Sequence, residues 1–145
     1  MPMLKSIAPQ ILIDDLDRSI SYYTSKLGFE QRISYGDSYA SVARDNAEIH
    51  LKVAPKLPAE RELRRSGGHI DAYIWVQDFE ALFETFKTNG ASILYPPKTQ
   101  PFGRLNLGGV TDFYVQDPDS YILCFGQDWL CFGQDWLCFG QDWPG

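Results

Sequence analysis

The feature that most constrains the fold is an internal repeat of a helical pattern. Residues 15–23 read Asp-Leu-Asp-Arg-Ser-Ile-Ser-Tyr-Tyr, and 63 residues later 78–86 read Asp-Phe-Glu-Ala-Leu-Phe-Glu-Thr-Phe. Each segment begins with an acidic residue suited to a helix N-terminus, and its apolar residues recur at the spacing of one helical face. A glycine follows each segment, Gly28 and Gly90, as is typical of the left-handed residue after a helix. The sequence therefore predicts two related helices.

Strand-like segments surround both helices in the same order. One short apolar run precedes each helix, at 10–13 and 72–76. Further strand-like runs follow, at 31–35, 38–43 and 48–53 in the first half and at 92–95, 110–116 and 121–125 in the second. We therefore predict an α+β fold of two βαβββ modules in tandem.

These modules should form a single domain over residues 1–127. Module 1 would span about 5–54 and module 2 about 69–127, because the prolines and glycines of 55–68 interrupt regular structure and indicate a linker. A short surface helix is expected at 59–65, with its charges facing solvent. The chain has 145 residues, 44% of them hydrophobic, which is enough for one core of this size.

The C-terminus carries a second, younger repeat. Leu-Cys-Phe-Gly-Gln-Asp-Trp occurs three times without a difference, at 123–129, 130–136 and 137–143, and contains every cysteine of the chain. Because seven is odd, a continuous strand would turn successive copies to opposite faces of a sheet. We therefore expect residues 128–145 to form a duplicated tail outside the domain, and we see no disulfide framework.

Charge and hydropathy limit the partners and the compartment. The net charge of −6 makes nucleic acid and anionic membrane surfaces poor partners. No apolar stretch is long enough to cross a bilayer, and no separate signal core precedes the first strand. We expect a cytoplasmic protein with no nucleic-acid partner and no membrane partner.

Two motifs carry a family resemblance. The segment 9–19, continued by Tyr22-Tyr23 and Lys26-Leu27-Gly28-Phe29, forms an opening module, and 112–119 forms a late strand with an Asp-Pro-Asp turn. Together they resemble the vicinal oxygen chelate (glyoxalase/bleomycin resistance protein/dioxygenase) superfamily over about residues 5–127, most closely its bleomycin-resistance and glyoxalase-like group. The resemblance implies a curled mixed sheet around a concave cavity with the helices outside, and a homodimer built on a two-fold axis.

Strand alternation predicts which side chains face that cavity. Apolar residues such as Ile11, Ile49 and Phe125 should pack against the helices. Their alternates, more polar and aromatic than a core, should line a ligand site. The predicted ligand-binding residues are His50, Asp71, Tyr73, Trp75, Phe102, Arg104 and Cys124. Phe102 and Arg104 are included because the equivalent loop of the family borders the cavity mouth.

The resemblance also bears on metal binding. The family's four metal-ligand positions correspond here to Ala8, His50, Asp71 and Cys124, and Ala8 offers no donor. We therefore predict no metal and no cofactor; the alternative is one divalent metal such as zinc held by the other three residues. Cys124 and His50 could also pair as nucleophile and base, but no third orienting group is evident, so we predict no catalytic residue.

The function predicted from these residues is ligand binding without turnover. Tyr73 and Trp75 beside Asp71, in a chain of net charge −6, suit a cationic or aromatic small molecule. We therefore expect a metal-independent binding protein of the drug- or antibiotic-resistance type. The alternative is an enzyme, a divergent metal-dependent lyase or dioxygenase of the same superfamily.

Overall fold

A computed structural model describes residues 2–54, 58–65, 70–101 and 108–130. Along these residues the elements run β1 (Gln10–Ile13), α1 (Leu16–Ser25), β2 (Glu30–Tyr35), β3 (Tyr39–Arg44), β4 (Ala47–Val53), α2 (Pro58–Arg65), β5 (Ala72–Trp75), α3 (Phe79–Thr88), β6 (Ile93–Pro101), β7 (Gly108–Gln116) and β8 (Ile122–Leu130). This order is β-α-β-β-β twice with α2 between. The predicted tandem modules are confirmed.

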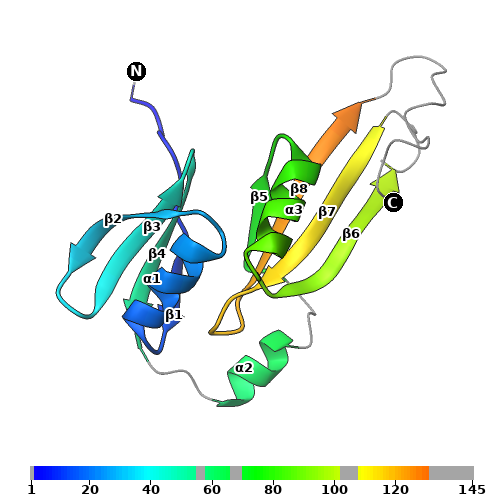
Figure 1. The fold of residues 1–145 in the computed structure, drawn as a ribbon. Helices are drawn as coiled ribbons and strands as arrows, with labels where there is room; N and C mark the ends of the chain where they lie inside the picture. The colour runs from blue at the N-terminus through cyan, green and yellow to red at the C-terminus, as the bar shows by residue number, and fades with distance from the viewer. Residues whose placement is uncertain (1, 55–57, 66–69, 102–107, 131–145) are drawn as a thin grey trace.

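Each module folds its strands into a mixed sheet of the same topology. The strand orders are β1-β4-β3-β2 in sheet 1 and β5-β8-β7-β6 in sheet 2 (Figure 1). In each sheet the strand before the helix pairs in parallel with the last strand, and the other pairs are antiparallel. The two halves are thus structural repeats.

The two helices begin differently despite their matching sequences. The Asp15 carboxylate caps α1 by accepting from the Arg18 N–H at 3.0 Å. Asp78 stands at the same position of α3, but its backbone is left-handed (φ 53°) and its side chain makes no capping bond. The Phe79 N–H instead donates to Gln127 Oε1 at 3.0 Å. The carboxylate of Asp78 is therefore not used by its own helix.

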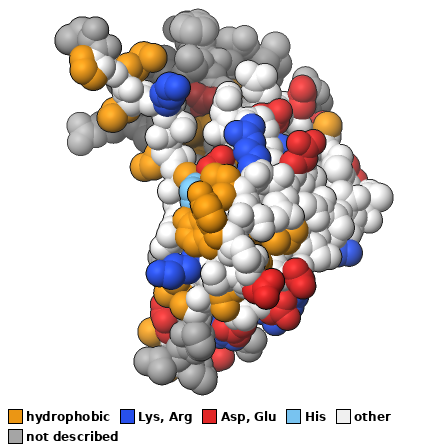
Figure 2. All heavy atoms as spheres, turned by 90° about the vertical axis from the view of Figure 1, so that its left-hand side faces the viewer, with side chains coloured by type: hydrophobic (Ala, Val, Ile, Leu, Met, Phe, Trp, Pro, Cys, Tyr) orange, Lys and Arg blue, Asp and Glu red, His pale blue; other side chains and the backbone are white. Residues whose placement is uncertain are grey.

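A single core joins the modules. The predicted inward alternates of both sheets, including Ile11, Ile49 and Phe125, form one buried cluster with Tyr23 of α1 and Phe86 of α3. We expected the helices outside a shared cavity. They lie instead on the side of each sheet that faces the common core, so the other face of each sheet stays open. Figure 2 views the open side of module 1, where hydrophobic side chains gather beside a histidine.

Helix α1 fixes module 1 to the turn between β7 and β8. The Tyr23 hydroxyl donates to Asp117 Oδ2 at 2.9 Å, and the Tyr22 hydroxyl donates to the Gln116 carbonyl at 3.0 Å. The Ser19 hydroxyl lies 3.2 Å from Asp119 Oδ2. Because these bonds are largely buried, they resist competition from water. They hold the two modules in one orientation.

Helix α2 also connects the modules at this joint. Arg61 forms ion pairs with Asp14 of module 1 and with Asp119 of module 2, the latter at 3.6 Å. Arg64 pairs with Asp71, and its guanidinium lies 4.3 Å from the centroid of the Tyr121 ring. The expected helix at 59–65 is present, but Arg61 bridges the modules and Arg64 ties the helix to module 2. The prediction of a purely solvated charge cluster is wrong because both arginines face acidic side chains of the joint.

The last strand is longer than the sequence suggested. β8 reaches Leu130, so the boundary expected at Gln127 falls inside it. Asp128 and Trp129 pair with Val110 and Gly109 of β7, and Trp129 is 9% exposed. The first tail copy is therefore part of the sheet. Residues 131–145 lie outside the described residues.

Candidate functional site

Two aromatic rings and a carboxylate dominate the open face of sheet 2. The Tyr73 and Trp75 rings lie 4.8 Å apart between centroids, tilted by 52°. The Tyr73 hydroxyl donates to Asp112 Oδ2 at 3.0 Å. Trp75 is 61% exposed and Tyr73 36%. An exposed aromatic pair beside a carboxylate attracts flat and cationic molecules by stacking and by cation–π interaction.

Backbone space at one glycine positions this group. The Tyr73 ring crosses the backbone of Gly126, where an added Cβ would overlap the tyrosine hydroxyl. On the neighbouring strand Asp112 pairs with Gly126, which brings the carboxylate under the same ring. A side chain at 126 would therefore push Tyr73 away from Asp112.

Sequence reasoning missed part of this face. Asp112 and Tyr114 share it, and the Tyr114 ring meets Tyr95 edge-on at 5.3 Å. The sequence carried the signal, because apolar Phe113 and Val115 alternate with Asp112 and Tyr114. In the structure Phe113 and Val115 are fully buried. Applying the alternation rule to 110–116 as well would have identified Asp112.

Cys124 lies under the aromatic pair and is a buried thiol. It is 0% exposed, and burial, followed by the charge of Asp112, raises its pKa well above the ordinary value. Burial and Asp112 likewise raise the pKa of Tyr73 well above its usual range. Both groups therefore stay protonated at neutral pH. Cys124 is thus a poor nucleophile, since thiolate is the reactive form.

His50 belongs to a separate polar network on the open face of sheet 1. Its Nε2 lies 2.8 Å from Glu48 Oε1, and its Nδ1 lies 2.6 Å from the Tyr39 hydroxyl. The Gln10 amide donates to the same hydroxyl at 3.1 Å. Because a carboxylate only accepts, the Nε2 of His50 carries the proton toward Glu48. Both ring nitrogens are therefore engaged.

Asp71 is engaged at the joint between the modules. Its carboxylate pairs with Arg64 and accepts from the Ile122 N–H at 2.9 Å. It ties α2 to the start of β8.

The structure brings together only part of the predicted site. Tyr73, Trp75 and Cys124 share one face. His50 lies on sheet 1, whose open face is turned away from sheet 2 within one chain (Figures 1 and 2). Phe102 and Arg104 lie outside the described residues.

The three residues of the alternative metal site do not fit a metal within one chain. His50 lies on sheet 1 and is bonded to Glu48 and Tyr39, whereas Cys124 lies on sheet 2 and Asp71 is paired with Arg64. Over residues 2–54, 58–65, 70–101 and 108–130, no group of three His, Cys, Asp or Glu side chains is placed to hold a metal.

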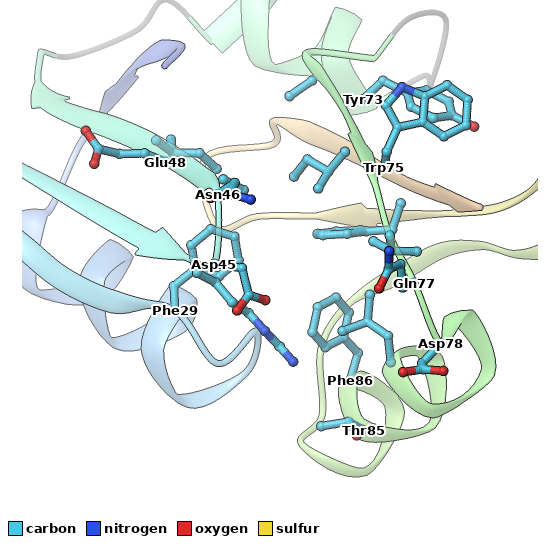
Figure 3. A pocket seen from close by; sticks show the side chains of 18 of the residues that line it. Phe29, Asp45, Asn46, Glu48, Tyr73, Trp75, Gln77, Asp78, Thr85 and Phe86 are labelled. Atoms are coloured by element: carbon cyan, nitrogen blue, oxygen red, sulfur yellow. The ribbon is translucent and has the colours of Figure 1, made fainter. Parts of the chain in front are cut away.

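A pocket lies between the modules on the core side of β5. It has a volume of about 870 Å³ and is bordered by the β3–β4 turn, β5 and the inner face of α3. Figure 3 shows Glu48, Asn46 and Asp45 on the module 1 side and Gln77, Asp78 and Thr85 on the other. Tyr73 and Trp75 border its upper edge and point away from module 1.

None of the described helices is long and apolar enough to cross a membrane.

The sequence profile of the Glyoxalase/Bleomycin resistance protein/Dioxygenase superfamily matches residues 4–125. No curated protein sequence shows a significant match.

Several solved structures share the fold. A glyoxalase/bleomycin resistance protein/dioxygenase from Alicyclobacillus acidocaldarius is 16% identical, with a TM-score of 0.67 over 85% of this chain and 90% of its own. A glyoxalase-related enzyme from Clostridium phytofermentans is 18% identical, with a TM-score of 0.66 over 88% and 98%. A bleomycin-binding protein from Streptomyces verticillus, complexed with copper(II)-bleomycin, is 21% identical, with a TM-score of 0.60 over 86% and 97%.

Proposed function

The chain belongs to the Glyoxalase/Bleomycin resistance protein/Dioxygenase superfamily, and from this premise we propose that it binds an aromatic or cationic small molecule without turning it over. The observation that carries the proposal is the exposed pair Tyr73 and Trp75 with the Asp112 carboxylate beside them. Stacking would hold a flat ring, and the carboxylate would select a positive charge.

The chemistry around the pair supports binding more than catalysis. The Cys124 thiol and the Tyr73 hydroxyl are protonated, so they can donate hydrogen bonds but do not supply a nucleophile. The ring nitrogens of His50 are taken up by Tyr39 and Glu48. Among the solved structures of this fold, the bleomycin-binding protein carries a drug, which supports the resistance-type interpretation.

The proposal includes a homodimer. Each chain leaves two open sheet faces, one with Tyr73 and Trp75 and one with His50, and a second copy would cover both. His50 would then approach the ligand from the other chain. Phe102 and Arg104 are kept as proposed ligand contacts from the loop before β7.

Substitution of Trp75 by alanine tests the proposal. The probes are copper(II)-bleomycin and the planar cation ethidium, titrated by calorimetry against protein purified without a metal-affinity step. We expect at least one probe to bind, and Trp75→Ala to weaken it by about 1–3 kcal/mol, or about 5- to 150-fold. Leu63→Ala, which removes an apolar side chain on α2 that is 70% exposed, should leave affinity unchanged.

A second substitution separates stacking from charge. Asp112→Asn keeps an acceptor for the Tyr73 hydroxyl but removes the negative charge. Ethidium affinity should fall, while Trp75 continues to stack. Failure of both probes to bind would overturn the proposal. One tightly held metal per chain that is lost in His50→Ala, Asp71→Ala and Cys124→Ala would favour the enzyme alternative.

A further inference from the structure

The internal repeat explains why the pocket between the modules exists. Each position of α1 corresponds to the position of α3 that lies 63 residues later in the chain. In α1, four side chains fill the joint with the β7–β8 turn: Arg18, Ser19, Tyr22 and Tyr23. Their counterparts in α3 are Ala81, Leu82, Thr85 and Phe86, and all four line the pocket. Opposite them lies the β3–β4 turn, the counterpart of the β7–β8 turn.

Two of these replacements put a much smaller side chain on α3. Ala81 stands where α1 has the guanidinium of Arg18, and Thr85 stands where it has the phenol ring of Tyr22. In α1 the guanidinium lies 3.1 Å from Asp119, and the phenol donates across the joint. At the corresponding positions of the pocket wall, α3 therefore carries no cation and no aromatic ring.

The walls of the pocket suit such a molecule. Two half-buried apolar side chains, Ile74 of β5 and Leu82 of α3, form an apolar wall. Two exposed carboxylates, Asp45 and Asp78, lie on opposite walls (Figure 3). Both residues have left-handed backbones, with φ of 52° and 53°. The Asp78 side chain also makes no capping bond to α3.

The other charged groups of the pocket already have partners. The Arg44 guanidinium donates to the Leu27 carbonyl at 2.8 Å and lies 5.9 Å from the Phe86 ring centroid. Glu48 is paired with His50 and, at 3.6 Å, with Arg32. The two carboxylates of Asp45 and Asp78 therefore outnumber the one guanidinium among the described residues of the pocket, that of Arg44. The resulting negative charge favours a cation.

We propose that this pocket is a binding site for a small aromatic cation, with the ring against Ile74 and Leu82 and the positive group between Asp45 and Asp78. The ligand takes the place that Arg18 and Tyr22 fill in the other module. The pocket meets Tyr73 and Trp75 at its edge, but none of the four proposed contacts belongs to the group of Tyr73, Trp75 and Asp112 on the open face. It does not rest on the proposed function.

The probes are benzamidine, its neutral isostere benzamide, and benzoate. Each is titrated into the full chain, and binding is followed by calorimetry and by the rise in melting temperature. We expect benzamidine to bind and to raise the melting temperature at pH 7, and the other two to bind at least tenfold more weakly. Equal binding of benzamide would refute the role of the carboxylates.

Refilling the pocket from the repeat is the decisive test. Ala81→Arg and Thr85→Tyr restore the residues of α1, and each should weaken benzamidine at least tenfold. Thr88→Arg adds the same charge on α3 outside the pocket lining and should not change affinity. Asp45→Asn and Asp78→Asn should each weaken benzamidine about fivefold, as expected when one of two counter-charges is lost.

Several results would overturn the inference. One is unchanged benzamidine affinity in folded Ala81→Arg and Thr85→Tyr, checked by circular dichroism. Another is loss of benzamidine binding in Asp112→Asn but not in Ala81→Arg, which would place the probe on the open face instead. A third is sedimentation showing that Ala81→Arg converts a dimer to a monomer, which would make the pocket a contact between copies.

Discussion

Asp117 should control how stability depends on pH. Its carboxylate is 5% exposed at the joint between the modules. Oδ1 accepts from the N–H groups of Asp119 and Tyr121 at 2.9 and 2.8 Å, and Oδ2 accepts from the Tyr23 hydroxyl at 2.9 Å. Burial outweighs these bonds and, with the charge of Asp119, raises the pKa of Asp117 from 3.8 to about 6.

The sign of the effect follows from proton uptake. Between pH 3.8 and about 6 the folded state holds a proton on Asp117 that the unfolded state has lost. The free energy of unfolding therefore falls as pH rises through this range, and the loss is complete above it. A difference of about two pKa units corresponds to about 3 kcal/mol.

Asp117→Asn removes this titration while keeping the geometry. The amide oxygen can accept from the Tyr121 N–H, and the amide nitrogen can donate to the Tyr23 hydroxyl oxygen. We therefore expect the stability of the variant relative to wild type to increase by about 2 kcal/mol between pH 4 and pH 7. Urea unfolding, followed by circular dichroism at intervals of half a pH unit, measures this difference.

The control is Asp37→Asn, which removes an exposed carboxylate from the β2–β3 turn. Its stability relative to wild type should change little over the same range. A wild-type protein whose stability does not fall between pH 4 and 6 would refute the reasoning. So would an Asp117→Asn variant whose stability falls as steeply as that of wild type.

Three further predictions concern the site, the tail and assembly. Gly126→Ala should displace the Tyr73 ring, which lies on an open face and can move toward solvent, so ethidium affinity should fall severalfold while the melting temperature changes little; unchanged affinity would contradict the positioning role. A chain ending at Leu130 should unfold like the full chain, whereas one ending at Gln127 loses buried Trp129 and should be about 2–4 kcal/mol less stable by urea unfolding; equal stability would show that the end of β8 contributes nothing. Sedimentation should show a dimer at micromolar concentration, and a mass of 16.5 kDa throughout would disprove it.

The fold could be predicted because local patterns repeat in the sequence. Acidic helix starts, the glycines after the helices, and alternation in the strands determine two βαβββ units without any knowledge of long-range contacts. The same alternation correctly separated the inward residues, such as Ile49 and Phe125, from the outward ones, such as His50 and Tyr73. These are properties of neighbouring residues, which sequence shows directly.

The arrangement of the site could not be predicted in the same way. The position of His50 relative to Tyr73 depends on how the modules meet, and contacts such as Tyr23 with Asp117 and Arg64 with Asp71 fix that orientation. No periodicity encodes such pairs. The pocket was missed for a different reason, because it results from side chains that α3 lacks. The helix comparison needed to see this was available in the sequence.

The tail repeat has a consequence for how the sequence can vary. The first copy forms β8 because the two residues just before it are held in place. The Tyr121 hydroxyl accepts from the Leu12 N–H, and the Ile122 N–H donates to Asp71. Every later copy offers the same seven residues, beginning again with leucine. Deletion of one whole copy therefore leaves β8 chemically identical through Trp129. Gene variants that gain or lose whole 21-nucleotide units here would leave the residues of β8 unchanged. Any other insertion in the first copy would shift the register of β8 against β7.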